Sequence, residues 1–496
     1  MVPPQQNLRK IRLEKLEKLK SLGINPYPAK YPREEISLVR KKKLGDFAQT
    51  SGRILALRKH GKMTFADLVD STGKIQICFR LDKVGEEKYS LLELFDVGDF
   101  LGVAGELFQT QAGEITIQVE DFSLLAKSIR PLPSSWYGLK DIEERYRKRY
   151  LDLLLNPSVK EIFLLRSKII SAMREFLDSR GFIEVETPTL QPLYGGANAR
   201  PFVTHHHALD TDFYLKISDE LYLKRLIVGG FDKVYEIDKD FRNEGMDKNH
   251  SPEFTMMECY WAYADYQDMM RLTEEMVEHL AKKVLGKTKI NYQGQEIELK
   301  APWQKLSMKE AIRQYLKIDV DQLSDKELLL EIQKRNLTYE EKPTLTGVTK
   351  GFKRGVAIAT LFEAVEPFLI QPTFILDFPK ETTALCKPKA SHPDLIERFE
   401  PYICGREVGN AYSELNDPLL QKEFFAEQVK AKKSGDEEAH PMDEDFVEAL
   451  EYGMPPTGGL GIGVDRLVMI LTNQPTIRDV VLFPAMKPQM PVKNKD

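Results

Sequence analysis

The sequence has few cysteines, no long apolar run and little net charge for its 496 residues. Its four cysteines (Cys78, Cys259, Cys386 and Cys404) lie far apart and lack the spacing of zinc ligands, so we expect free thiols in a cytoplasmic chain. The apolar runs are too short to span a bilayer and the basic N-terminus is unlike a signal peptide, so no membrane association is expected. A net charge of −5 gives no general attraction to nucleic acid, although a local basic patch suffices to bind RNA.

The composition that remains is typical of a soluble globular enzyme. Hydrophobic residues make up 42% and charged residues 30% of the chain. The length indicates two or three domains with ample core.

Residues 1–45 are predicted to form a basic helix and a linker. Apolar side chains recur at helical spacing over residues 8–22, with lysines and arginines between them, and Gly23 and the prolines after it end the helix. Two interpretations stay open at this point. The helix either packs one face on the protein or contacts RNA phosphates with its basic side chains.

Residues 46–130 have the pattern of a small β-barrel. Five strand candidates are separated by turn residues, with a helical interruption near residues 86–95. This arrangement fits an OB-type barrel, whose strands and loops bind oligonucleotides.

Residues 131–490 follow a hinge-like linker and mix helical with strand-like patterns. Helices are expected at 142–155 and 159–180, and residues 267–354 carry mainly helical patterns that suggest an accessory region. An α+β fold is predicted for this larger part.

A strand-like stretch at residues 252–260 predicts a pocket. Phe254, Met256, Glu258 and Tyr260 alternate with other residues, so a strand would direct all four to one face. Two of the four carry polar groups that are costly to bury without partners. Such a face therefore suits a pocket better than a core.

Two arginines lie where they could reach a nucleotide phosphate. Arg242 ends the strand that precedes this face, and an arginine there can bind a phosphate bidentately. Residues 458–463 are rich in glycine and lead into an apolar helix with Arg466 in its first turn. Glycines permit close backbone approach, and a helix start beside an arginine suits phosphate.

The order of these stretches resembles that of the class II aminoacyl-tRNA synthetases. Residues 181–188 are similar to motif 1 of that class, residues 241–258 to motif 2 and residues 459–466 to motif 3. Within the class, the resemblance is closest to lysyl-tRNA synthetases of the bacterial type, and it runs from about Arg53 to Pro488. The further signatures are those at residues 195–202, 220–225 and 405–417.

The resemblance implies the architecture and the reaction. It implies a class II antiparallel-sheet catalytic domain at 131–490 and an N-terminal OB-fold at 46–130 that binds the anticodon, in a cytoplasmic homodimer formed through motif 1. The implied reaction activates L-lysine with ATP to lysyl-adenylate and pyrophosphate, and then transfers lysine to the 3′-terminal ribose of tRNA(Lys). About three Mg²⁺ ions per subunit are implied as cofactors.

The resemblance also assigns residues to the ATP and metal sites. Arg242 is expected on the α-phosphate and the substrate carboxylate, and Arg466 on the γ-phosphate, and these two are the predicted catalytic residues. Ser251 departs from the family, which usually has an asparagine there, so a two-point amide contact is lost. The other expected contacts are Glu244, His250 and Phe254 around the adenosine, and Glu400 and Glu407 on Mg²⁺.

Acidic residues are expected to select the amino acid. Asn410, Tyr412 and Glu414 alternate, so a strand would direct all three to one side, where Glu258 and Tyr260 are also expected. Carboxylates and a hydroxyl suit the lysine ε-ammonium, which offers three donors and no acceptor. The aspartyl and asparaginyl relatives typically have an arginine at the position of Glu414, which is thus the sharpest specificity signal. The resemblance adds to this pocket Gly196 and Glu220, for the α-amino group, together with Arg242 and Gly461.

For the barrel, the resemblance implies that Phe65 stacks on an anticodon base, that Gln76 hydrogen-bonds another and that Arg53 supports them. Without the resemblance, Phe65 would more often belong to the barrel core.

Two alternative functions remain. The first is a related class II enzyme of another specificity, aspartyl, asparaginyl or protein-lysylating. The acidic pair Glu258 and Glu414 argues against the first two, and the N-terminal barrel argues against the third. The second is an inactive paralogue that binds RNA. The presence of Arg242, Arg466 and both predicted Mg²⁺ ligands argues against it.

Overall fold

The structure is a computed structural model that describes residues 5–133, 139–339, 352–433 and 441–489. The chain divides into two compact units, Met1–Lys140 and Asp141–Asp496. Within the described ranges, no helix is both long and apolar enough to cross a membrane.

The first unit is built around a closed barrel with the strand order β1-β2-β3-β5-β4, which confirms the predicted OB-type barrel. Residues alternate between its interior and its outer face: in β2, Thr64, Ala66 and Leu68 are buried, whereas Phe65 and Asp67 face outward. The elements are β1 (Phe47–His60), β2 (Met63–Val69), β3 (Lys74–Arg80), β4 (Phe100–Gln109) and β5 (Ile115–Ala126), with α2 (Ile36–Val39), α3 (Leu81–Val84), α4 (Glu86–Ser90) and η1 (Leu91–Leu94).

Helix α1 (Gln5–Ser21) packs one face on this barrel. Leu16 and Leu19 are buried there, but Ile11 and Leu22, which share the same periodicity, are exposed. The buried stripe is therefore narrower than the sequence pattern predicts.

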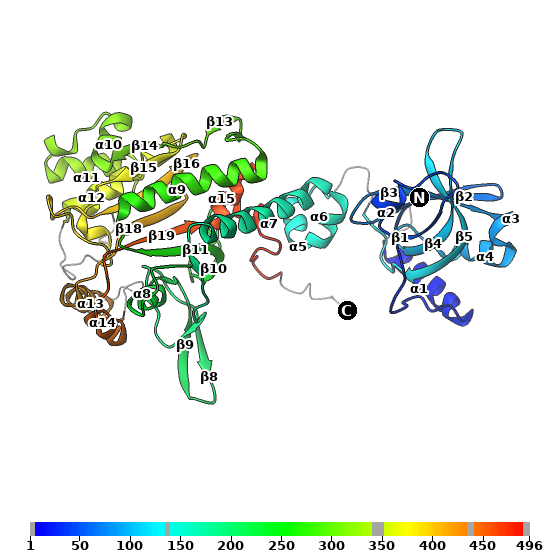
Figure 1. Ribbon diagram of the computed structural model, residues 1–496, viewed down its shortest axis with the longest axis horizontal. Coiled ribbons are helices and arrows are strands. Elements are labelled where there is room, and N and C mark those ends of the chain that lie inside the picture. Colours follow the sequence, from blue (N-terminus) through cyan, green and yellow to red (C-terminus); the bar gives the residue numbers. More distant parts are fainter. Residues whose placement is uncertain (1–4, 134–138, 340–351, 434–440, 490–496) are drawn as a thin grey trace. The chain divides into compact units, whose positions relative to one another are not determined.

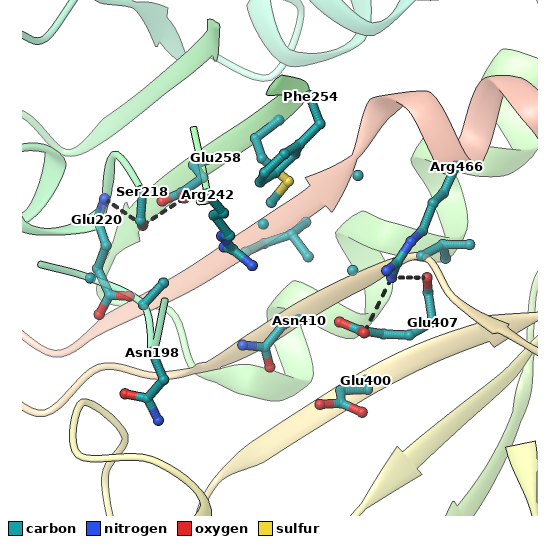
Figure 2. A pocket seen from close by; sticks show the side chains of 18 of the residues that line it. Asn198, Ser218, Glu220, Arg242, Phe254, Glu258, Glu400, Glu407, Asn410 and Arg466 are labelled. Atoms are coloured by element: carbon teal, nitrogen blue, oxygen red, sulfur yellow. Dashed lines mark hydrogen bonds and ion pairs between the residues drawn. The ribbon is translucent and has the colours of Figure 1, made fainter. Parts of the chain in front are cut away.

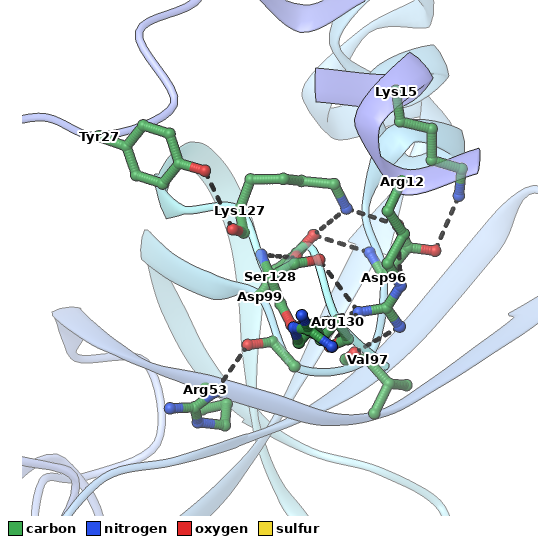
Figure 3. A network of polar contacts seen from close by, with 11 residues as sticks. Arg12, Lys15, Tyr27, Arg53, Asp96, Val97, Asp99, Lys127, Ser128 and Arg130 are labelled. Atoms are coloured by element: carbon green, nitrogen blue, oxygen red, sulfur yellow. Dashed lines mark hydrogen bonds and ion pairs between the residues drawn. The ribbon is translucent and has the colours of Figure 1, made fainter. Parts of the chain in front are cut away.

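Charged side chains also fix α1 to the barrel (Figure 3). Arg12 donates hydrogen bonds to the carbonyls of Val97 at 3.0 Å and Ser128 at 3.1 Å, and Lys15 Nζ lies 2.8 Å from Asp96. The packing interpretation of this helix is thus established, and RNA contact by its outer face stays a prediction.

The second unit contains a nine-stranded sheet in the order β14-β15-β16-β18-β19-β11-β10-β6, with β17 paired to β16. The pairs β14–β15 and β10–β6 are parallel and the others are antiparallel. The strands are β6 (Ile183–Glu184), β10 (Lys233–Phe241), β11 (Glu253–Ala262), β14 (Gln304–Ser307), β15 (Thr373–Leu376), β16 (Arg398–Ile403), β17 (Arg406–Glu407), β18 (Gly409–Ser413) and β19 (Thr457–Gly463).

Helices bury the sheet in two apolar clusters. The first includes α7 (Pro157–Asp178), α9 (Tyr266–Leu280) and α15 (Val464–Leu471), and Figure 1 shows α9 lying along the sheet. The second cluster includes α8 (Glu220–Val228), α10 (Met308–Leu316), α11 (Asp325–Lys334), α12 (Arg354–Phe362) and α14 (Glu444–Glu451). The unit also contains β7 (Leu190–Gln191), β8 (Val203–His206), β9 (Thr211–Leu215), η5 (Glu366–Phe368), η6 (Lys380–Thr382), α13 (Pro418–Lys433) and α16 (Ile477–Val480).

Two segments differ from the expected helices. The helix expected at 142–155 is split into α5 (Ile142–Arg147) and α6 (Arg149–Leu155), because Lys148 has a φ of −116° and a ψ of 50°, outside the helical region. The accessory segment 267–354 holds η3 (Ala281–Leu285) and η4 (Val320–Gln322), but also the hairpin β12 (Lys289–Tyr292) and β13 (Gln295–Glu298), and its β14 joins the main sheet.

Candidate active site

A cavity of about 370 Å³ lies over β11, β18 and β19 of the second unit. It brings together side chains that are far apart in the sequence. All residues predicted for the ATP, metal and lysine sites line it: Gly196, Glu220, Arg242, Glu244, His250, Phe254, Glu258, Tyr260, Glu400, Glu407, Asn410, Tyr412, Glu414, Gly461 and Arg466.

Strand register places the pocket residues in two rows. Both rows have a glycine of β19 in the middle, which leaves room above the sheet. A methyl group at Gly459 would lie 1.8 Å from Glu414 Oε1 and 2.7 Å from Tyr260, so these side chains occupy the space that the glycine leaves. The rows are Glu258–Gly461–Asn410 and Tyr260–Gly459–Tyr412.

Three buried glutamates converge at one end of the cavity, and we call Glu220, Glu258 and Glu414 the acidic end. Ser218 Oγ donates to Glu258 Oε1 at 2.8 Å (Figure 2), and Tyr412 Oη donates to Glu220 Oε2 at 2.6 Å. Burial raises the pKa of Glu258 to about 8, and the charge of Glu220 adds to this effect. This end therefore favours a cationic ligand.

A second carboxylate layer lies beside the acidic end. Oxygens of Asp219, Asp240 and Glu258 lie within 4.8 Å of one another. Lys216 Nζ is 2.6 Å from Asp219 and 3.1 Å from Glu236, which leaves Asp240 without a hydrogen-bond partner among the described residues. Burial and the neighbouring carboxylates of Asp219 and Glu258 raise the pKa of Asp240 well above its usual range. This layer was not predicted from the sequence, although acidic residues at alternate positions of β10 are its signal.

Arg242 follows the last residue of β10 and lies between the two ends of the cavity (Figure 2). Its guanidinium makes long hydrogen bonds of 3.4 Å to the carbonyl of Ile217, and its Cζ is 5.0 Å from the centre of the Phe254 ring. Glu244 also lines the cavity and is exposed. The guanidinium of Arg242 thus has further N–H donors with which it can bind an anion in the middle of the cavity.

At the other end, Arg466, His250 and Glu407 form what we call the arginine end. Arg466 Nη1 donates to the Glu407 carbonyl at 2.8 Å and lies 3.3 Å from Glu407 Oε2, while Nη2 lies 3.3 Å from His250 Nε2. The preceding residue, Asp465, pairs with Arg166 of α7 at 2.5 Å. This ion pair fixes the first turn of α15 and so the direction of Arg466.

Glu400 lies on β16 beside the arginine end. Arg398 donates to its Oε1 at 2.6 Å, and Tyr402 donates to its Oε2 at 2.8 Å. Burial raises the pKa of Glu400 to about 7; Arg398 opposes this shift and the charge of Glu407 adds to it. Glu366, missed by the sequence analysis, lies 3.1 Å from Tyr402 Oη. An oxygen-ligated divalent cation would offset this acidic charge, so Glu400 and Glu407 fit a Mg²⁺ site.

The residues predicted for the anticodon lie on the barrel, in the other unit. Phe65 and Gln76 are half-buried on outward positions of β2 and β3, so Phe65 is not a core residue. Arg53 donates to the Gly98 carbonyl at 3.0 Å (Figure 3), and its guanidinium lies 4.2 Å from the centre of the Phe100 ring. Arg53 is thus engaged within the barrel, and its contact with RNA stays a prediction.

Comparison with known families matches both units. A profile described as tRNA synthetases class II (D, K and N) matches residues 141–487. A profile described as OB-fold nucleic acid binding domain matches residues 48–125.

Curated relatives are similar over almost the whole chain. A lysine–tRNA ligase of Thermoanaerobacter pseudethanolicus is 54% identical over 488 residues, which cover 97% of this chain and 96% of the relative. A lysine–tRNA ligase of Moorella thermoacetica is 52% identical, covering 98% of this chain and 99% of the relative. One of Clostridium novyi is 51% identical, covering 97% and 94%.

Proposed function

The chain belongs to the class II tRNA synthetases, among their lysine–tRNA ligases, and from this premise we propose how its cavity divides the reaction. The enzyme activates L-lysine with ATP and transfers lysine to tRNA(Lys). We assign the ammonium groups of lysine to the acidic end, the phosphates of ATP to the arginine end and the reacting carboxylate to Arg242 between them.

The acidic end selects a cation in two ways: it attracts positive charge, and a neutral ligand there costs free energy. The carboxylates of Glu220, Glu258 and Glu414 are buried with one ammonium, that of Lys224, beside them, and a neutral side chain in the same place would leave acidic charge unbalanced. When a wrong substrate leaves buried polar groups of a site unpaired, its kcat/KM falls by a large factor relative to the correct substrate. The acidic end therefore favours lysine over aspartate and asparagine, whose side chains carry no positive charge.

Activation is attack of the lysine carboxylate on the α-phosphate, and the residues act mainly by holding two anions together. Arg242 lies where it can bind both reacting groups, which brings them into contact and offsets their repulsion. Arg466 neutralises charge that develops on the leaving pyrophosphate. Phe254 offers its ring to the adenine, and Glu244 and His250 offer polar atoms to the adenosine.

Glu400 and Glu407 would hold Mg²⁺, and their acidic surroundings support this assignment. The bound ion supplies charge neutralisation on the phosphate oxygens. Three ions per subunit is the number that the family resemblance implies, and it stays part of this proposal.

The barrel is assigned to the anticodon of tRNA(Lys). Its profile is that of a nucleic-acid-binding OB-fold, and Phe65 and Gln76 face outward, where a base could stack or form hydrogen bonds. Arg53 would support this surface from within the barrel.

A homodimer in the cytoplasm completes the proposal. Motif 1 contributes β6, which ends the sheet order, and Ile183 of β6 and Leu164 of α7 are 52% and 54% exposed. An apolar sheet edge beside an exposed helix suits a two-fold interface. The four cysteines are free thiols, as is usual in a reducing compartment.

The acidic end is the observation that carries the assignment, and pyrophosphate exchange tests it. Incorporation of labelled pyrophosphate into ATP is measured with each of the twenty amino acids. Exchange with lysine alone is expected. Exchange with aspartate or asparagine would contradict the assignment of the acidic end, and no exchange with any amino acid, tRNA present, would favour an inactive RNA-binding paralogue.

A further inference from the structure

Lys224 is a fully buried lysine of α8 that contacts the acidic end from behind. Its side chain is 0% exposed, and it is not among the residues that line the cavity. Its Nζ lies 2.5 Å from Glu220 Oε1 and also contacts Glu414 Oε2. Lysine is almost never fully buried unless it is paired, so these two carboxylates are what allow Lys224 to be buried here.

The contacts of Lys224 leave one particular oxygen for a ligand. Glu220 uses its second oxygen to accept from Tyr412 Oη at 2.6 Å. Glu414 Oε1, by contrast, has no hydrogen-bond partner among the described residues and lies directly over Gly459 in the cavity. Lys224 thus holds Glu414 so that Oε1 is presented to whatever occupies the acidic end.

Lys224 also opposes protonation of Glu414: burial raises the pKa of that carboxyl well above its usual range, the Lys224 ammonium lowers it, and the charges of Glu220 and Glu258 add to the rise. Burial lowers the pKa of Lys224, but Glu220 and Glu414 outweigh this effect and raise it, so the ammonium stays charged. Other titratable groups face this site from α8 (Glu220), β11 (Glu258 and Tyr260), β18 (Tyr412) and the Cys386 segment. Burial raises the pKa of both tyrosines and of the thiol, so they stay neutral. Without the ammonium, the pKa of the Glu414 carboxyl would be higher still.

We propose that Lys224 is a positioning residue that directs Glu414 at the ε-ammonium of the substrate and opposes its protonation, and so sets the preference for lysine over uncharged amino acids. This inference rests on the proposed assignment of the acidic end to lysine. Lys224 itself does not touch the substrate, and its effect passes through Glu414.

The test is pyrophosphate exchange by the full-length enzyme with Lys224→Met, which keeps the volume and removes the charge. The KM for lysine is expected to rise roughly 100-fold, as for removal of one partner of a buried ion pair, while kcat changes less than about 3-fold. The pKa of Glu414 should be higher without the ammonium, so the KM of the variant should carry an added pH dependence and fall with rising pH over a higher range than the KM of the wild type. Lys224→Arg, which keeps the charge, should show no such added pH dependence.

A double-mutant cycle shows whether Lys224 acts through Glu414. In a Glu414→Gln background, Lys224→Met should add less than about 3-fold to the KM for lysine. The same factor in both backgrounds would overturn the inference.

Lys127→Met is the matched control for loss of a buried lysine. Lys127 lies in the barrel unit, is 0% exposed at its side chain and pairs with Asp96 at 2.5 Å and Asp99 at 2.8 Å. It should lower the melting temperature but leave the KM for lysine unchanged. If Lys224→Met does no more than this, its role is structural and the inference fails. A wild type that does not exchange with lysine would instead contradict the proposed function.

Discussion

At the scale of single residues, lysine binding depends on buried acidic groups that outnumber the one buried ammonium beside them. Glu258 and Glu414 lie at one end of the cavity with their carboxylates buried, and Arg242 lies in its middle with donors to spare. Burying charge that is not balanced by an opposite charge costs free energy, so such groups are typical of sites where a bound ligand supplies the opposite charge. The predictions at this scale change the charge or geometry of one such group.

Lysine binding should strengthen as the pH rises from 6 to 8. Burial raises the pKa of Glu258 to about 8, and the ammonium needs the carboxylate form, so one proton must leave on binding below this pH. The Kd measured by calorimetry should fall by up to about tenfold per pH unit and level off above pH 8. Glu258→Gln should bind lysine weakly and lose most of this slope. A wild-type Kd that increases with pH over the same range would contradict the prediction.

Arg242→Lys should reduce the rate of exchange while keeping the positive charge. An ammonium cannot bind two anions in the planar, bidentate manner of a guanidinium, so kcat should fall at least roughly 100-fold. Arg225→Lys is the matched control, because Arg225 pairs with Asp443 and does not line the cavity. An equal effect of both substitutions would show that Arg242 has no special part in the reaction.

At the scale of elements, β19 makes room for the pocket because it has glycines where side chains would otherwise fill the space. A methyl group at Gly459 would overlap Glu414 Oε1, at 1.8 Å, whereas one at Gly461 would meet the flexible end of Met256 at 3.1 Å. Gly459→Ala should therefore raise the KM for lysine by at least about tenfold, and Gly461→Ala should raise it less. Exchange kinetics of the two variants provide the comparison, and the reverse order would contradict this view of the strand.

The sequence predicted the faces of elements better than their contacts. Alternation of Phe254 with Glu258 indicated a pocket face, and both do line the cavity. Alternation cannot show that Lys224 of α8 meets Glu414, since that contact depends on how distant segments pack. The residues most distant in sequence, such as Gly196 and Glu400, were predicted only by family resemblance.

Short strands were the least predictable elements. In the accessory segment, β14 pairs with β15, more than sixty residues away, and β12 with β13 forms a small hairpin. Strands of four residues carry too little alternation to be distinguished from loops or helix ends. The sequence therefore predicted the helices of this region and missed its share of the main sheet.

At the scale of the whole molecule, the two units should contribute to different steps. Exchange needs only lysine and ATP, whereas transfer needs tRNA on the barrel as well. Phe65→Ala should therefore reduce kcat/KM for tRNA charging by roughly 10-fold, as for loss of one stacked base, and leave exchange unchanged. Phe47→Ala is the matched control, since Phe47 is 56% exposed on β1 where that strand pairs with β4. A loss of exchange in Phe65→Ala, or equal losses of charging in both variants, would contradict the division.

The most direct test of the central claim is a crystal structure of the enzyme with a non-hydrolysable lysyl-adenylate analogue and Mg²⁺. The account predicts the ε-ammonium beside Glu258 and Glu414, the phosphate on Arg242 and the adenine against Phe254. A side chain of the analogue placed at the arginine end, or an ammonium without contact to either glutamate, would contradict it.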